Sequence, residues 1–167
     1  MTNQQATQHD ITPLAKDEAG NDQTTAAHLA YLIEEEKFAH DVYQVLGEKW
    51  GSRVFTNIQR SEATHQSAVL GVMQSRELTD PRQRVIGKFT HQDLQKLYDQ
   101  LIAQGNKSAS EAYAVGVTVE TTDIADLEKA IKDLNAKDTD IKAVYDLLLS
   151  GSENHLRAFE RQQSRTN

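Results

Sequence analysis

The sequence of 167 residues contains no cysteine, only two prolines and only one tryptophan. The absence of cysteine excludes a disulfide framework, a thiolate nucleophile, a rubredoxin-type iron centre and a cysteine-based zinc finger. Any metal that the chain binds through its side chains must therefore be held by oxygen and nitrogen atoms.

The chain also lacks long apolar runs and clusters of basic residues. No stretch approaches the roughly 18 consecutive apolar residues of a transmembrane helix, and the N-terminus has no signal-peptide pattern. The net charge is −7, without the basic face that binds phosphate groups, which argues against nucleic acid as a partner. We expect a soluble protein and favour the cytoplasm, but Met1 and the polar residues after it also fit an exported protein whose signal has been removed.

One domain is expected from the length of the chain. Residues 1–21 are polar and show no sustained periodicity, which predicts a flexible N-terminal arm. Residues 22–162 are predicted to form the folded domain, and residues 163–167 a frayed C-terminus.

The hydrophobic period is that of α-helices throughout the domain, and no useful strand-type alternation interrupts it. Together with capping residues and glycines, it predicts four long helices and one short helix, at about 22–50, 52–75, 108–135, 138–162 and 90–105. Thr90 and Asp93 form a pattern like a capping box at the start of the short helix. The predicted fold class is all-α: two antiparallel helix hairpins form a four-helix bundle, and a long crossover with a short extra helix joins them.

Each long helix carries an apolar stripe that a carboxylate or an imidazole interrupts near its middle. The interrupting residues are Glu36 in the first long helix, Glu62 and His65 in the second, Glu120 in the third and His155 in the fourth. Glu62 and His65 share a face because they are three residues apart on a helix. The stripes therefore predict that three carboxylates and two imidazoles meet inside the bundle.

Ionised carboxylates are costly to bury, on the order of tens of kcal/mol in the idealised limit for one without a partner. The nearby basic residues Lys37, Arg60 and Arg157 lie on other faces of their helices, so a divalent cation is the expected counter-ion. Oxygen and imidazole ligands without thiolate suit iron, manganese or zinc. We favour iron, with one or two ions bound.

These residues resemble the ferritin-like superfamily, whose di-metal carboxylate centres take one Glu from each of two helices and a Glu-x-x-His pair from each of the other two. Glu36 with Ala39 and Tyr43, and the segment 61–65, are similar to the first two helices of rubrerythrin-type proteins. Over about residues 25–160 the pattern most resembles a prokaryotic ferritin-like family of unknown function, DUF2202.

The resemblance implies a ferritin-like bundle with Glu36, Glu62, His65, Glu120 and His155 as metal ligands. It also implies a reaction of the metal with oxygen or peroxide, as in an oxidase, ferroxidase or peroxidase. A rubrerythrin-like peroxidase would need an external electron donor here, since the chain has no cysteine to bind a second iron centre. A homo-oligomer is compatible with the resemblance, and the residues argue neither for nor against an iron-storage cage.

The fourth helix departs from the family pattern, because Ser152 occupies the position of the last ligand Glu. Two spare carboxylates are candidates to replace it. Asp123, one turn after Glu120, is the better placed, whereas Glu153 is next to Ser152 but turned about 100° away. If neither is recruited, the site is expected to be lopsided or to hold a single ion.

Other polar residues near the stripes have simpler interpretations. Tyr43 lies two turns after Glu36 and Tyr113 two turns before Glu120 on the same stripes, so each either hydrogen-bonds the site or fills the core. We interpret Glu34 and Glu35 as part of a solvated face, and His40 as exposed.

Two alternatives to a metal-dependent oxidoreductase stay open. The first is a non-catalytic bundle in which a metal ion, or a remnant polar network, only stabilises the core. The second is a lost site whose carboxylates are protonated. The di-iron oxidoreductase is the interpretation that we favour.

Overall fold

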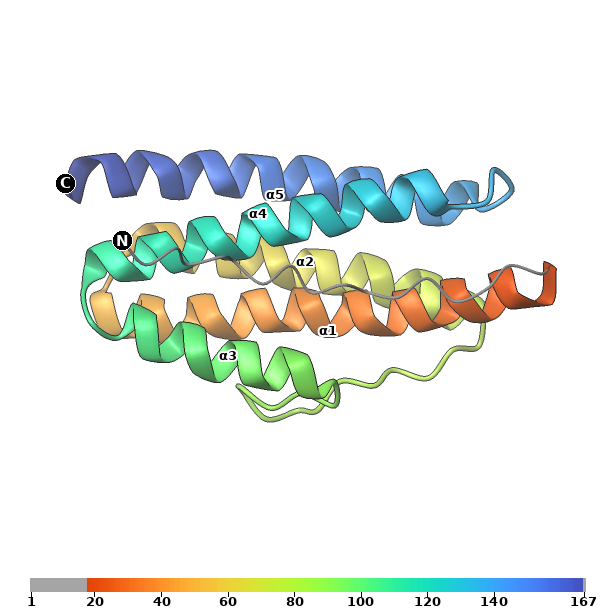
Figure 1. Cartoon of the computed structure of the whole chain (residues 1–167), viewed down its shortest axis with the longest axis horizontal. Helices are drawn as coiled ribbons and strands as arrows, with labels where there is room; N and C mark the ends of the chain where they lie inside the picture. Colours follow the sequence, from red (N-terminus) through yellow and green to blue (C-terminus); the bar gives the residue numbers. More distant parts are fainter. Residues whose placement is uncertain (1–17, 167) are drawn as a thin grey trace, which may run out of the picture.

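The structure is a computed structural model that describes the backbone of residues 18–166 and the side chains of residues 24–165. It consists of five α-helices, and no β-strand occurs among these residues. The helices are α1 (Glu18–Trp50), α2 (Arg53–Ser75), α3 (Gln92–Gly105), α4 (Ala109–Asp133) and α5 (Thr139–Thr166) (Figure 1). The prediction of an all-α fold is confirmed.

Four of the helices form a bundle of two hairpins. α1 pairs with α2 and α4 pairs with α5, while α2 packs against α5 and α1 against α4. After α2 the crossover runs back along α1 to α3, which lies on the outside of the bundle against α1 and α4 (Figure 1). The predicted arrangement of hairpins, crossover and extra helix is therefore confirmed. In the described part of the chain, no helix combines the length and the apolar character needed to cross a membrane.

Two predicted boundaries differ from the observed helix ends. α1 begins at Glu18, so the last residues of the arm predicted at 1–21 are helical, and residues 1–17 lie outside the described part. α5 runs to Thr166, past the predicted end of the domain at residue 162. Periodicity marks neither end, because the terminal turns consist mostly of polar residues.

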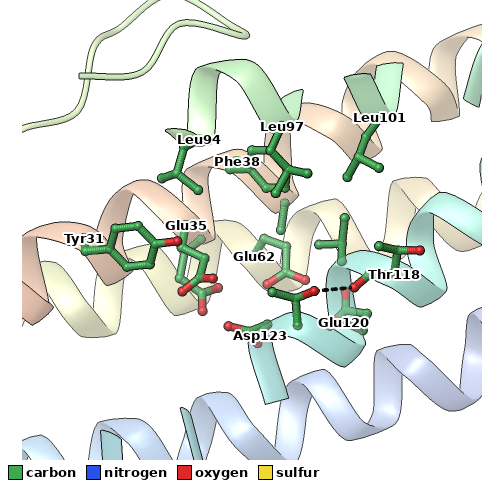
Figure 2. A pocket seen from close by; sticks show the side chains of 14 residues that line it. Tyr31, Glu35, Phe38, Glu62, Leu94, Leu97, Leu101, Thr118, Glu120 and Asp123 are labelled. Carbon is green, nitrogen blue, oxygen red and sulfur yellow. Dashed lines mark hydrogen bonds between the residues drawn. The ribbon is translucent and has the colours of Figure 1, made fainter. Parts of the chain in front are cut away.

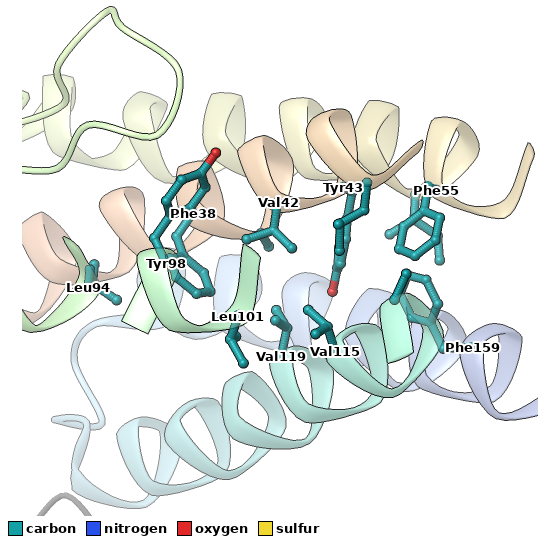
Figure 3. Close-up of a cluster of buried hydrophobic side chains, with 14 of the residues drawn as sticks. Phe38, Val42, Tyr43, Phe55, Leu94, Tyr98, Leu101, Val115, Val119 and Phe159 are labelled. Atoms are coloured by element: carbon teal, nitrogen blue, oxygen red, sulfur yellow. The ribbon is translucent and has the colours of Figure 1, made fainter. Parts of the chain in front are cut away.

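Two apolar clusters fill the bundle, one on either side of a polar layer. The first is rich in aromatic rings, with Tyr43, Phe55 and Phe159 in mutual contact (Figure 3). The second is mostly aliphatic and includes Leu127 and Leu148. On every bundle helix the acidic and imidazole residues of the stripes fall between members of the two clusters, which fixes the height of the polar layer.

The middle of α1 is buried on all sides, from Leu32 to Ala39. The crossover and α3 cover its outer face, where Glu34 accepts hydrogen bonds from the backbone N–H groups of Thr90 (2.7 Å) and His91 (2.8 Å). His91 is the N-cap of α3, and its side chain makes no capping hydrogen bond. The carboxylate of Glu34 therefore accepts from the N–H groups at the start of α3, in place of the predicted capping pair of Thr90 and Asp93. Glu34 is only 2% exposed, and its interpretation as a solvated residue was wrong.

A buried ion pair between Lys37 and Asp41 fastens the crossover to α1. Lys37 Nζ also donates to the carbonyl oxygen of Val85 (3.0 Å), and Asp41 accepts from the backbone N–H of Gly87 (2.9 Å). Gly87 has a φ of +71°, and a Cβ there would lie 2.6 Å from the Tyr98 ring, so glycine is required at this position. Lys37 thus holds the crossover and, as the sequence indicated, does not neutralise the polar layer.

Candidate metal centre

The polar layer holds two overlapping groups of potential metal ligands. One consists of Glu36, Glu62 and His65, the other of Glu62, Glu120 and His155, and the ligand atoms within each group lie within 4.8 Å of one another. All five side chains are buried, and together they come from all four bundle helices. The structure therefore brings together the five residues that interrupt the apolar stripes.

Glu62 occupies the centre of the layer and contacts both imidazoles. Its Oε2 lies 2.8 Å from Nδ1 of His65, and its Oε1 lies 2.9 Å from Nδ1 of His155. Nδ1 of His65 is also 3.1 Å from Oε2 of Glu36, and Nδ1 of His155 is 3.6 Å from Oε2 of Glu120. Each Nδ1 therefore faces two carboxylates, one of which is shared, and the two rings stack with 5.5 Å between their centroids.

Three buried side-chain atoms in this layer have no hydrogen-bond partner among the described residues: Oε1 of Glu36, Oδ1 of Asp123 and Nδ1 of His155. The His155 nitrogen is close to Glu62 but is not aligned with it for a hydrogen bond. Because buried polar atoms are nearly always satisfied, three such atoms in one layer indicate a place for a ligand. Carboxylate oxygen and imidazole nitrogen are donors that iron, manganese and zinc accept, so these residues fit such an ion.

The imidazoles and the shared carboxylate neutralise each other when no cation is bound. Burial alone would raise the pKa of Glu62, but the adjacent His155 and His65 outweigh it and hold this pKa at about 2. Burial alone would lower the pKa of each imidazole, but the carboxylates beside them raise the pKa of His65 to about 10 and that of His155 to about 9. Both imidazoles are therefore protonated at neutral pH without a metal.

The other carboxyl groups of the layer shift in the opposite direction. Burial raises the pKa of Glu120 to about 8 and that of Asp123 to about 7, and neighbouring carboxylates add to the effect. Burial likewise raises the pKa of Glu36 well above its usual value. The layer thus holds protons at neutral pH that a divalent cation would displace.

Asp123 lies beside the position where the family pattern has its last ligand Glu. It accepts a hydrogen bond from the hydroxyl of Ser152 on α5. A Cβ on the preceding residue, Gly151, would lie 2.5 Å from the ring of His65, so both short residues of α5 make room for polar groups of other helices. The second spare carboxylate, Glu153, is exposed, and among the charged side chains that the structure describes it approaches only that of Arg157, at 3.9 Å. Of the two, Asp123 alone belongs to the layer.

The two candidate tyrosines have different surroundings. Tyr43 is fully buried and donates a hydrogen bond to Oε1 of Glu120 at 2.5 Å. Tyr113 lies with its hydroxyl 3.0 Å from that of Ser52, and its ring stacks on Phe55. Tyr43 therefore contacts the polar layer, whereas Tyr113 packs at the edge of the aromatic cluster.

Glu35 is an acidic residue of this region that the sequence interpretation placed in solvent. It is only 8% exposed, and its carboxyl group hydrogen-bonds that of Asp126 on α4. Burial, and next the charge of Asp123, raise the pKa of Glu35 well above its usual value. Nothing in the stripe of α1 signals this burial, because α3 and the crossover cover this face. His40 is partly exposed and contacts Asp41 at 2.9 Å, outside the layer.

A cavity of about 60 Å³ leads from the carboxylates towards α3 (Figure 2). Its lining includes carboxylates of the layer, leucines of α3 and exposed threonines of α4: Glu36, Glu62, Glu120 and Asp123; Leu94, Leu97 and Leu101; Thr118 and Thr122. The cavity therefore extends from the polar layer to the surface between α3 and α4.

Residues 25–166 match the family described as uncharacterized protein domain DUF2202. The chain belongs to this family. The DUF2202 chain is 45% identical over 134 residues to the uncharacterized protein MJ0754 of Methanocaldococcus jannaschii, a match that covers 80% of this chain and 71% of that protein. It also resembles the crystal structure of the hypothetical protein MJ0754 from Methanococcus jannaschii, with a TM-score of 0.82, 37% identity and coverage of 96% of this chain and 87% of that one.

The polar layer lies wholly within the DUF2202 match, since its residues run from Glu36 to His155. The layer is thus part of the family domain itself. The family resemblance predicted from the sequence is confirmed by the match, and the relatives carry no assigned activity.

Proposed function

We propose that this protein binds two divalent metal ions in the polar layer and reacts with oxygen or peroxide there. One ion would be held by Glu36, Glu62 and His65, and the other by Glu62, Glu120 and His155. Iron is the metal that we favour for this reaction, with manganese as the redox-active alternative; zinc fits the same ligands but would not exchange electrons. The observation that carries this proposal is the shared Glu62, whose two oxygens each face the Nδ1 atom of a different imidazole.

The charges of the layer suit two divalent ions. When Glu36, Glu62, Glu120 and Asp123 are all ionised, their four negative charges balance the four positive charges of two such ions. The imidazoles must then be neutral, because Nδ1 offers its lone pair only after it has lost its proton. Metal binding is therefore expected to release protons to the solvent.

The metal ions would supply the capacity to exchange electrons with a small oxidant. The chain's own residues orient the ligands: Ser152 donates to Asp123, and Tyr43 donates to Glu120. The cavity beneath α3 gives a molecule of the size of oxygen or peroxide a route to the same carboxylates. Since the chain has no cysteine to hold a second iron centre, the electrons for repeated turnover would come from an external donor.

Metal content after loading tests the binding part of the proposal. We expect metal-free protein, mixed with excess iron(II) under anaerobic conditions and then desalted, to retain two ions per chain by elemental analysis. The matched control is Glu153→Gln, which removes an exposed carboxylate of α5 and should retain the same amount. Retention of no iron, manganese or zinc would overturn the proposal and leave a protonated polar network.

Exposure of the loaded protein to air or peroxide tests the catalytic part. We expect oxygen consumption faster than that of iron(II) in buffer, together with a change in the visible absorption spectrum. A protein that retains two ions but shows neither change would be a bundle that metal ions only stabilise. At a free ion concentration about a hundred times the dissociation constant, such stabilisation amounts to about 2.7 kcal/mol.

A further inference from the structure

The cavity beneath α3 has a second acidic group outside the proposed ligands. Glu35 lines the cavity, and its carboxyl group hydrogen-bonds that of Asp126 on α4. Glu35 is 8% exposed, whereas Asp126 is partly exposed, so this pair connects the surface with the interior. Neither residue belongs to the two groups of potential metal ligands.

Two residues that line the same cavity carry unpartnered oxygens. Oε1 of Glu36 and Oδ1 of Asp123 have no hydrogen-bond partner in the described structure, and their residues are 3% and 7% exposed. Both residues line the cavity, and Figure 2 shows the carboxyl groups of Glu35, Glu62 and Asp123 around one space. No lysine, arginine or histidine is among the residues that line it. The polar side chains of the lining therefore offer a cation oxygen atoms, and the rest of the lining is apolar.

Structural stability does not account for Glu35 and Asp126. Two carboxyl groups in contact, of which one is buried, must share a proton or repel each other, and an apolar or amide side chain of similar volume would fill the same place at lower cost. The oxygens would instead serve a cation, since hard divalent ions prefer carboxylate ligands.

We propose that Glu35 and Asp126 form a transient binding site through which hydrated divalent cations reach the polar layer, with Asp123 as the next ligand inward. The pair offers few ligands and is partly exposed, so an ion binds there weakly and moves on to the carboxylates and imidazoles of the layer. This inference rests on the proposed metal binding and adds the path by which the ions arrive.

The rate of cobalt(II) binding tests the path. Metal-free protein is mixed with cobalt(II) in a stopped-flow instrument, and the visible absorption of the bound ion gives the association rate. The variants are Glu35→Gln and Asp126→Asn, which keep the shape of each side chain and replace a carboxyl group that can bind a cation by a neutral amide. The matched control is Glu128→Gln, an exposed carboxylate on the same helix as Asp126.

We expect both variants to bind cobalt(II) about ten times more slowly than the unchanged protein and the control, since local charge at a cleft changes association rates by roughly that factor or more. The final number of ions and their affinity should not change. Removal of cobalt by a chelator should therefore slow by the same factor, because the ion leaves by the path through which it arrives.

Three other outcomes would be decisive against the path. Unchanged rates in both variants, with normal cobalt binding by the unchanged protein, would show that ions arrive elsewhere. A lower final stoichiometry would make Glu35 or Asp126 a permanent ligand. Slower association with an unchanged release rate would mean lower affinity, and would also overturn the path.

If the unchanged protein binds no cobalt, manganese or iron, the proposed function itself fails. Asp126→Asn alters a partly exposed residue and keeps the test valid if Glu35→Gln does not fold.

Discussion

The two hairpins of the bundle contribute unequally to the polar layer. The α1–α2 hairpin supplies Glu36, Glu62 and His65, and the rings and carboxylates there contact one another within 3.1 Å. The α4–α5 hairpin supplies Glu120, Asp123 and His155, and the contact between Glu120 and His155 is longer, at 3.6 Å. The α1–α2 half is therefore the more compact of the two.

The main difference between the hairpins is one residue: α5 has a serine at the position that corresponds to a glutamate of α2. Where α2 has Glu62, α5 has Ser152, and the hydroxyl of Ser152 bonds Asp123 of α4 instead. The number of carboxylates in the layer is thus kept at four, but α4 carries two of them and α5 none. The comparison teaches that α5 has no carboxylate in the layer, while its neighbour α4 has a second one, Asp123, one turn after Glu120.

Substitution of Glu62, the shared carboxylate, should have the largest effect on metal binding. Glu62→Gln removes the one charge that both halves use, so we expect the affinity for both ions to fall by more than ~100-fold, beyond the loss typical of residues that only orient ligands. Isothermal titration with cobalt(II) measures this, with Glu153→Gln as the control. Loss of one ion only would contradict the central position of Glu62.

Glu36 and Glu120 each serve one half and should each affect one ion. Glu36→Gln should abolish binding in the α1–α2 half and Glu120→Gln binding in the α4–α5 half, so that elemental analysis finds one ion per chain in either variant. The double variant should retain none. If either single variant loses both ions, the two halves do not bind independently.

Substitution of Ser152 should have a smaller effect on metal binding, confined to the α4–α5 half. Ser152→Ala removes the hydrogen bond to Asp123 but no ligand charge, so the ion of the α4–α5 half should bind about tenfold less tightly. The ion of the α1–α2 half should keep its affinity. Titration of Ser152→Ala beside Ser150→Ala, an exposed serine of α5, measures the difference. Equal losses at both ions would show that Asp123 serves the whole layer.

The smallest expected difference between the two halves is in their pH dependence. In the metal-free protein, the histidines of the two halves should lose their protons about one pH unit apart. The folded pKa values of His155 (about 9) and His65 (about 10) lie above the unfolded value of 6.5. The stability that their protons confer is therefore complete below about pH 6.5 and is lost as the pH rises, first through about 9 and then through about 10. The raised pKa of Glu120, about 8, acts in the same direction.

Thermal melting in the presence of a chelator measures this loss as a fall in melting temperature between pH 7 and 10. The ring signals of the two histidines in NMR spectra should show that His155 loses its proton first. A melting temperature that stays constant or rises over this range would contradict the protonated network.

The helical period was sufficient to find the layer. Glu36, Glu62, His65, Glu120 and His155 replace apolar residues in stripes whose flanks form the two clusters, and a helix face persists whatever packs against it. The period could not separate Tyr43 from Tyr113, because both lie on such stripes. Which of them contacts the layer depends on the relative heights of neighbouring helices.

The helical period could not predict that residues on the outer face of α1 are buried. Glu34, Glu35 and Asp41 occupy positions that a four-helix bundle leaves in solvent, yet all three are buried. They are covered because the crossover and α3 fold back over α1. The backbone N–H groups of Thr90 and His91 donate to Glu34 and that of Gly87 donates to Asp41, whereas Glu35 meets Asp126 of α4. A periodic pattern in α1 contains no information about that later segment.

The sequence by itself determined the helical elements, the hairpins and the faces on which acidic and imidazole residues lie, since all of these depend on spacing within one helix. Only the tertiary structure decided that Glu62 is shared, that Asp123 rather than Glu153 joins the layer, and that Glu35 lines a cavity. These depend on contacts between helices distant in sequence, where a rotation or shift of one helix exchanges the residues that meet.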